Sequence, residues 1–422
     1  MNLRNGDRVA LVGDSITAAG QYHLFLTDYY FTRRPKDKIR FYNLGISGGT
    51  ANDANLRLDW DIQPKNCNKA FVMFGMNDIQ YQLFQAAVCN QNKGQQKEAV
   101  KSGCYNIERL TEQIGGEIAL MTPTPYEQLA ELGQKNCFGA DDSLKQIAAF
   151  DKKLAKEKGY LLIDLHMAML RENTRLRKKE PDGSLVGADR IHPGILGHAL
   201  IAREILKALG ESETVSVFEY DMEIRAVCRM KNMRVHDLKL SEEGMQFIYQ
   251  PNSLPLALDG ESEQYLSLFN QEILRVSGLP KGKYRLLLDR LDAGTFTAAQ
   301  LQKGIQLAVL EANPNLQRAR YVHSLNQTRS EYEHKHRISK NFLIKLKAQK
   351  IDLTDKGRVE KAVESYASLY DNKEYYQFVK EMFYRFNMGT DKGFLEEMER
   401  MYQDIYRVNR PLDYRIELLR CI

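Results

Sequence analysis

Apolar positions in the first half of the chain follow two patterns that alternate. Short continuous apolar runs are typical of strands buried on both faces, and apolar residues three or four positions apart are typical of helices. The predicted strands are Val9–Val12, Ile39–Leu44, Ala70–Phe74, Ile118–Met121 and Tyr160–Ile163. The predicted helices are Tyr22–Tyr30, Ala51–Asp61, a long helix ending near Ile114, Leu144–Lys156 and Gly197–Leu209. This alternation predicts an α/β fold with a parallel sheet covered by helices on both faces.

Two helix ends carry residues with suitable capping chemistry. Asp142 and Ser143 directly precede the helix predicted at Leu144, where their side chains are placed to cap its N-terminus. Gly210 follows Leu209, and glycine is common directly after a helix. The α/β pattern therefore ends at about residue 210.

The pattern changes after that point. From about Val215 to Leu288 the segments resemble antiparallel pairs, for example HDLKL and MQFIYQ, joined by Ser241–Gly244, whose glycine suits a turn position with positive φ. From residue 289 to the end the sequence is helical and charged. We therefore expect three consecutive regions: an α/β domain at 1–210, a β-rich module at 211–288 and a helical region at 289–422.

Composition limits the class of protein. A chain of 422 residues favours two or three domains, and 43% hydrophobic residues are enough for a substantial core. No apolar stretch approaches the ~20 residues that a membrane-spanning helix needs. A strand follows the N-terminus at once, with no visible signal peptide. We expect a cytoplasmic protein, or a secreted one if a leader has been removed.

The net charge and the cysteine spacing restrict the class of partner and the redox compartment. A net charge of +5 is mild for this length and does not indicate a nucleic-acid partner, which usually requires a dense basic face. The six cysteines form no CxxC pair and show no regular spacing, so we interpret them as separate thiols in a reducing compartment, although their even number leaves disulfides open. The sequence does not indicate an oligomeric state.

Candidate chemistry begins at the end of the first predicted strand, in RVALVGDSIT. One interpretation is that Asp14 or Ser15 only caps the following helix. The other is that Ser15 is a nucleophile at a strand-to-helix turn. The other strand ends decide between them, because ligands of open α/β sheets bind beyond the carboxyl ends of the strands. Three further blocks lie where they can meet there: NLGISGGT, FGMND and ADRIHPGILGH.

The side chains in these blocks complement one another. A serine nucleophile needs a base, usually His, and a group that orients the imidazole. Asp189 and His192 stand three positions apart, close enough for the carboxylate to reach the imidazole N–H. A tetrahedral intermediate also needs hydrogen-bond donors, and the candidates are the backbone N–H groups of Ser15 and Gly48 and the side-chain amide of Asn77.

At this point the sequence resembles the SGNH hydrolases, also called GDSL esterases. The four blocks GDSIT, ISGGT, GMND and DRIHP follow the family's order, over about Asp7 to Leu209. The resemblance implies a flavodoxin-like three-layer α/β/α fold, with Ser15 as nucleophile, His192 as base and Asp189 as orienting acid. It also implies that Gly48 and Asn77 are oxyanion donors, and that neither a metal nor a cofactor is needed. Gly-Gly here replaces the more familiar Gly-Asp of SGDT.

Other residues have alternative interpretations. His166 follows a strand and could be a second base, although a polar residue satisfied at the sheet edge is the simpler interpretation. His198 could join a metal site with His192, but no third ligand of suitable spacing is near. We interpret Asp14 and Asp78 as structural carboxylates that bond backbone amides. The segment EYEHKHRISKNFLIKLKAQK is interpreted as the solvated face of a long helix, with binding to an acidic polymer as the alternative.

The resemblance implies a serine esterase that works through an acyl-enzyme. We expect a small acyl ester, such as an O-acetyl group on a saccharide, as the substrate. The family also includes lysophospholipases and thioesterases, and a carbohydrate-binding protein without catalysis is a further alternative. The region after residue 210 is similar, more loosely, to a C-terminal extension on some bacterial family members, and this similarity assigns it no activity.

Overall fold

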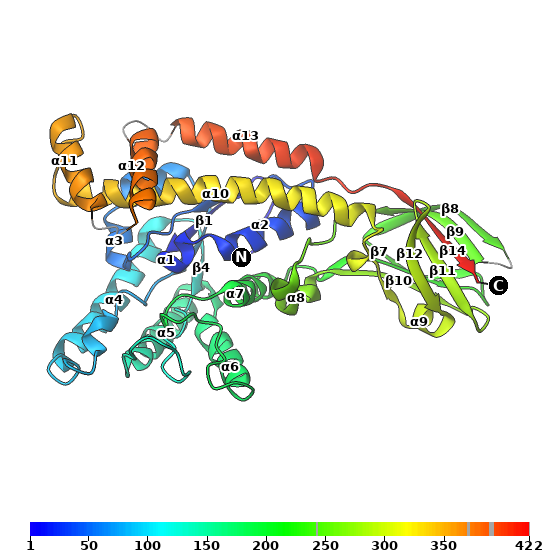
Figure 1. The fold of residues 1–422 in the computed structure, drawn as a ribbon, viewed down its shortest axis with the longest axis horizontal. Coiled ribbons are helices and arrows are strands. Elements are labelled where there is room, and N and C mark those ends of the chain that lie inside the picture. Colours follow the sequence, from blue (N-terminus) through cyan, green and yellow to red (C-terminus); the bar gives the residue numbers. More distant parts are fainter. Residues whose placement is uncertain (242–243, 369–371, 388–391, 422) are drawn as a thin grey trace. The chain divides into compact units, whose positions relative to one another are not determined.

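The computed structural model describes residues 1–241, 244–368, 372–387 and 392–421 (Figure 1). Contacts divide the chain into two compact units. Unit 1 comprises Met1–Phe25, Ile39–Gly210 and Thr328–Arg400, and unit 2 comprises Leu26–Lys38, Glu211–Gln327 and Met401–Ile422.

Unit 1 is built on a parallel sheet of five strands. The strands are β1 (Arg8–Gly13), β2 (Arg40–Asn43), β3 (Lys69–Met73), β4 (Glu117–Met121) and β5 (Leu161–Ile163), in the order β2-β1-β3-β4-β5. All neighbouring pairs are parallel. This is the flavodoxin-like strand order, in which the chain adds β2 on one side of β1 and then β3, β4 and β5 on the other side. The predicted α/β fold with a parallel sheet is confirmed.

Both faces of this sheet are buried. Ala10, Val12 and Val72 share one apolar core with residues of three helices, namely α3 (Ala51–Asn55), α4 (Lys93–Ile114) and α5 (Ala140–Lys158). The alternate residues Val9 and Leu11 are fully buried on the other face, and α7 (Ile195–Ala208) packs against β5. Helices on both faces explain why these strands are continuous apolar runs. The remaining helices of the first 210 residues are α1 (Ser15–Ala18), α2 (Gln21–Arg33) and α6 (Leu165–Arg177).

Several helix ends differ from the sequence prediction. Helix α5 begins at Ala140 after Gly139, whose φ is +94°, so Asp142 and Ser143 lie inside the first turn and do not cap it. The helix predicted to reach Asp61 stops at Asn55, and a short π-helical turn follows at Leu58–Ile62. The glycine expected to end the last helix of this region does so, since Gly210 has a φ of +68°.

Unit 2 contains two sheets that enclose one core. The first has the order β13-β10-β6-β7 and the second β12-β11-β14-β9-β8. The strands are β6 (Thr214–Asp221), β7 (Ala226–Lys231), β8 (Met233–Ser241), β9 (Gly244–Pro251), β10 (Gln271–Ser277), β11 (Lys283–Leu288), β12 (Leu291–Thr297), β13 (Ile305–Gln306) and β14 (Tyr414–Arg420). Phe218 and Leu274 of the first sheet pack with Phe247, Leu286 and Ile416 of the second.

The β-rich region confirms part of the prediction and corrects part of it. Strands β8 and β9 form the expected antiparallel pair, and Gly244 has a φ of +149°; Glu242 and Glu243 of the predicted turn lie outside the described residues. The pair of β6 and β10 is parallel, although antiparallel pairs were expected throughout. Strand β14 comes from the end of the chain, where the sequence predicts helix, and lies between β9 and β11.

The helices after residue 210 are α8 (Gly260–Leu266), α9 (Ala298–Lys303), α10 (Pro314–Ala348), α11 (Lys356–Ala367), α12 (Lys373–Asn387) and α13 (Lys392–Val408). The two units therefore do not follow the three consecutive regions expected from the sequence. Residues 328–400 belong to the same unit as the parallel sheet, and unit 2 combines three separate segments. The physical reason is that buried contacts, described below, connect α10 with the loops of the parallel sheet. No helix in the described part of the chain combines the length and the apolar character needed to cross a membrane.

Candidate active site

In the loop after β1, the structure shows which residue of GDS caps the following helix. Asp14 is the cap of α1, and its Oδ1 accepts a hydrogen bond of 2.9 Å from the backbone N–H of Ile16. Ser15 is the first residue of the helix and takes no part in the cap. Its side chain is therefore available for a different contact.

Ser15 is joined to His192 and Asp189 by a chain of hydrogen bonds. Oγ of Ser15 lies 2.7 Å from Nε2 of His192, and Nδ1 of His192 lies 2.5 Å from Oδ2 of Asp189. A carboxylate only accepts, so the imidazole proton sits on Nδ1 and Nε2 is left to accept the serine hydroxyl proton. The His192 side chain is 47% exposed, so a substrate in solution can reach these hydrogen-bonded residues.

Asp189 is held in its ionised form. Burial of the carboxyl opposes ionisation, but hydrogen bonds from His192 and from the backbone N–H of Ile191 outweigh it, and the pKa of Asp189 lies below its ordinary value. Its Oδ1 accepts the N–H groups of Ile191 and His192 at 3.0 Å each. These bonds fix the carboxylate at the start of the DRIHP loop, with its second oxygen facing the imidazole.

Gly48 and Asn77 lie on the loops that follow β2 and β3. Gly48 has a φ of +74°, a conformation that glycine adopts without strain, and a Cβ placed there would meet no atom within 4 Å. Nδ2 of Asn77 donates to the carbonyl of Gly49 at 3.0 Å. An amide group has two N–H donors, so this contact orients Asn77 and leaves its second N–H for a ligand.

Two buried carboxyls support these loops, as expected for Asp14 and Asp78. Asp78 accepts the N–H groups of Ala51 at 2.9 Å and of Gly75 at 3.0 Å, so it ties the loop after β3 to the start of α3. Burial raises the pKa of Asp78 to about 7 and that of Asp14 to about 6. The charge of Asp14 adds to the shift of Asp78, since two buried negative charges disfavour each other.

Helix α10 supplies contacts to the same loops that the sequence did not reveal. Glu333 accepts the backbone N–H of Asn43 at 2.9 Å, and Nδ1 of His334 lies 2.9 Å from the carbonyl of Ala18. Arg337 donates to the carbonyl of Gly45 at 3.2 Å. These residues belong to the segment interpreted as a solvated face. That interpretation is wrong for Glu333 and Arg337, which are 5% and 2% exposed, because each has a charged partner inside the protein.

The other candidate histidines lie apart from this chain of hydrogen bonds. His166 is buried in the first turn of α6, with Nε2 3.0 Å from Oδ1 of Asp141, and it is satisfied there. His198 is buried too, and burial lowers its pKa to about 3, with the charge of His192 adding to the shift. Among the described residues, no group of three His, Cys, Asp or Glu side chains is placed to hold a metal ion.

Comparisons with known proteins bear on the family of this part of the chain. A model of the GDSL-like lipase/acylhydrolase family matches residues 11–200. An acetylxylan esterase from Geobacillus stearothermophilus is 25% identical over 227 residues, which are 50% of this chain and 97% of that protein. A solved structure described as a gut microbial diltiazem-metabolizing enzyme is 28% identical, with a TM-score of 0.87, and the match covers 100% of this chain and 98% of that one. The second similarity therefore includes the regions after residue 210. Through residues 11–200 the chain belongs to the GDSL-like lipase/acylhydrolase family, the SGNH hydrolases, and it is a carboxylic ester hydrolase.

Proposed function

We propose that Ser15 is the nucleophile of a two-step ester hydrolysis. Its Oγ attacks the ester carbonyl while Nε2 of His192 takes the hydroxyl proton, and Asp189 stabilises the imidazolium that forms. His192 then gives this proton to the leaving alcohol, and an acyl group remains on Ser15. Water attacks the acyl-enzyme with His192 again as base, and the acid and free Ser15 are released. The observation that carries this proposal is the hydrogen-bonded chain from Ser15 Oγ to Asp189 at 2.7 and 2.5 Å.

The negative charge on the tetrahedral oxygen needs donors that are already in place. We assign this role to the backbone N–H groups of Ser15 and Gly48 and to the second N–H of Asn77. In the described part of the chain neither backbone N–H donates to another group. Donors oriented before the reaction stabilise the transition-state charge more than water does, because they need no reorganisation when the charge develops.

We propose a short acyl group, an O-acetyl ester on a saccharide, as the substrate. The exposed His192 side chain supports a substrate that approaches from solvent. The names of the relatives add chemical support: acetylxylan carries acetate esters on sugar hydroxyls, and diltiazem also carries an acetate ester. An acetyl ester is thus common to both compounds. Lysophospholipids and thioesters remain the alternative substrates.

A rate comparison tests the acyl length and the substrate class. We expect kcat/KM to be higher for p-nitrophenyl acetate than for p-nitrophenyl octanoate, and acetate to be released from acetylated xylo-oligosaccharides. Ser15→Ala is the control for every rate. A preference for octanoate would favour the lysophospholipase alternative. If a fluorophosphonate probe does not label Ser15 in the intact protein, the proposed nucleophile is incorrect.

A further inference from the structure

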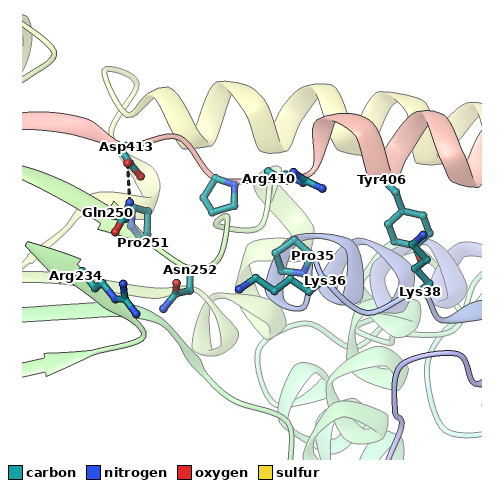
Figure 2. A pocket seen from close by; sticks show the side chains of 11 residues that line it. Pro35, Lys36, Lys38, Arg234, Gln250, Pro251, Asn252, Tyr406, Arg410 and Asp413 are labelled. Carbon is teal, nitrogen blue, oxygen red and sulfur yellow. Dashed lines mark hydrogen bonds between the residues drawn. The ribbon is translucent and has the colours of Figure 1, made fainter.

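A cavity in unit 2 takes no part in the chemistry described above. Its volume is about 650 Å³, within the range of small-molecule sites. Three regions of the chain form its walls: the residues after α2, the ends of β8 and β9, and the residues between the last turn of α13 and β14. Figure 2 shows the side chains that line it.

The lining is strongly basic. Four side chains are cationic, Lys36, Lys38, Arg234 and Arg410, and the carboxylate of Asp413 is the acidic group of the lining (Figure 2). Among the described residues, no carboxylate pairs with Lys36, Arg234 or Arg410. The four cationic side chains are exposed and carry like charge, so together they attract anions from solution, most strongly at low salt. The cavity therefore has the charge of an anion site.

The acidic residue is already engaged. Oδ2 of Asp413 accepts from Nε2 of Gln250 at 2.8 Å (Figure 2). Oε1 of Gln250 lies 3.1 Å from Nε2 of His236. The hydrogen bond from Gln250 orients the carboxylate without neutralising a cation. Helix C-termini also attract positive charge, and α2 and α13 both end near the lining cations. Attraction to a helix C-terminus does not account for the positive charge of Arg234 in the lining, because Arg234 lies on strand β8.

The backbone that carries Arg410 is fixed. Arg318 donates to the carbonyls of Val408 and Arg410 at 3.3 and 3.2 Å. Asn315 exchanges two hydrogen bonds with the backbone of Leu412, at 2.7 and 3.0 Å. A site whose backbone is ordered before binding loses less conformational entropy when a ligand arrives.

One wall of the cavity is aromatic. Tyr406 lines it, and its ring is held by an edge contact with Phe31 at 5.6 Å and a stacked contact with Tyr402 at 6.4 Å between ring centres. Amide groups of Gln250 and Asn252 lie in the same lining. Inorganic phosphate would occupy only a small part of such a volume, whereas a sugar ring fits an aromatic wall and amide donors.

We propose that this cavity binds a carboxylated saccharide, with the uronate held by Arg410, a sugar ring against Tyr406 on the same side, and Arg234 adding positive charge at the other end of the lining (Figure 2). Guanidinium groups bind carboxylates through two parallel hydrogen bonds, which suits a uronic acid. The anionic character of the ligand rests on the cavity alone. The choice of a saccharide rests on the proposed function, and it makes this a second binding site for an acidic, acetylated polysaccharide.

Calorimetry on the full chain tests the proposal. The Ser15→Ala variant is titrated with three probes at pH 7 and low salt: a xylotriose carrying one 4-O-methylglucuronic acid, neutral xylotetraose, and inorganic phosphate. We expect the acidic oligosaccharide to bind at least about tenfold more tightly than the neutral one, as loss of a charge-assisted contact implies. Its affinity should fall as salt is added.

Two variants locate the site. Arg234→Gln together with Arg410→Gln should weaken binding of the acidic probe at least about tenfold and leave hydrolysis of p-nitrophenyl acetate unchanged when Ser15 is present. Lys239→Gln removes an exposed cation from the same strand as Arg234, outside the lining, and should leave binding unchanged.

Four results would overturn the proposal: equal binding of acidic and neutral probes, phosphate binding as tight as the acidic probe, no binding of any probe, or no effect of the paired variant. Equal phosphate binding would show a general anion site. Failure of the proposed function would appear separately, as a lack of acetate release from acetylated xylo-oligosaccharides, because the calorimetry does not depend on turnover.

Discussion

Arg337 on α10 and Asp61 form a buried ion pair in which two guanidinium nitrogens each lie 2.8 Å from a carboxylate oxygen. Asp61 also pairs with Arg57 at 2.6 Å. Burial opposes ionisation of Asp61, but these two cations hold its pKa well below the ordinary value. The arginines donate onward to the backbone carbonyls of Leu44 and Gly45. The loop after β2, which carries an assigned oxyanion donor, is thereby held by a residue outside the family-matched region.

Replacement of Arg337 tests this relationship. We expect Arg337→Met to lower the free energy of unfolding by about 3 kcal/mol, since loss of one member of a buried ion pair is costly and Arg57 still neutralises Asp61. At a temperature where the variant is fully folded, kcat for p-nitrophenyl acetate should also fall several-fold with little change in KM. Urea denaturation and steady-state kinetics measure the two effects.

The control for this variant is Arg407→Met. Arg407 forms an exposed pair with Asp404, in which the two side chains are 76% and 55% exposed. Such surface pairs contribute about 1 kcal/mol or less. If both variants unfold at the same urea concentration, the buried pair does not stabilise the loop as we infer. A lower stability with kcat unchanged would limit Arg337 to a structural role.

The catalytic sheet and its loops could be predicted because each depends on local sequence. Buried parallel strands must be apolar along their length, and three of the four blocks follow strand ends that a parallel sheet places on one edge. The fourth block, DRIHP, lies between α6 and α7. The pairing of Arg337 with Asp61 could not be predicted, because its partners are 276 positions apart and a charged helix face has the same pattern whether buried or solvated. Strand β14 did carry a signal, since Tyr414, Ile416 and Leu418 alternate as the buried side of a strand.

Removal of Ser15 and His192 tests whether they act as one unit. We expect Ser15→Ala and His192→Ala each to lower kcat by several orders of magnitude, and the double variant to be little worse than either. Steady-state kinetics on p-nitrophenyl acetate, with protein free of host esterase, measure this. Activity of Ser15→Ala within about tenfold of the wild type would exclude Ser15 as the nucleophile.

Asn77→Ala should lower kcat by roughly a hundredfold or more and leave KM nearly unchanged, because the removed donor acts on charge that develops in the transition state. The same change removes the contact with the Gly49 carbonyl, so the melting temperature must be measured alongside. A rise in KM at constant kcat would show that Asn77 contacts the substrate in its ground state instead.

Glu272 in unit 2 should make stability depend on pH. It is fully buried, accepts from Nδ2 of Asn313 at 2.9 Å, and burial raises its pKa to about 7 from an ordinary 4.5. The folded protein therefore keeps a proton that the unfolded chain releases above pH 4.5, so this group's contribution is complete below that pH and is lost as pH rises through 7.

We expect Glu272→Gln, which mimics the protonated carboxyl, to be more stable than the wild type at pH 8 by up to about 3 kcal/mol, and to show little difference at pH 4.5. Chemical denaturation across this pH range measures the change. Glu261→Gln, at an exposed position of α8, is the control and should follow the wild type at every pH. Parallel curves for Glu272→Gln and the wild type would contradict the assignment.

A fragment ending at Gly210 should be less stable and less soluble than the full chain, although it holds all five assigned site residues. It loses Thr328–Arg400, which belongs to the same compact unit as the parallel sheet, and with it Arg337 and Glu333. The backbone N–H of Asn43 then has no carboxylate partner and Asp61 keeps only Arg57. We expect a lower melting temperature, a slower turnover of p-nitrophenyl acetate, and continued labelling of Ser15 by a small phosphonate, because the hydrogen-bonded chain itself lies within the fragment. Equal melting temperature and equal turnover would show that the catalytic domain is independent of α10.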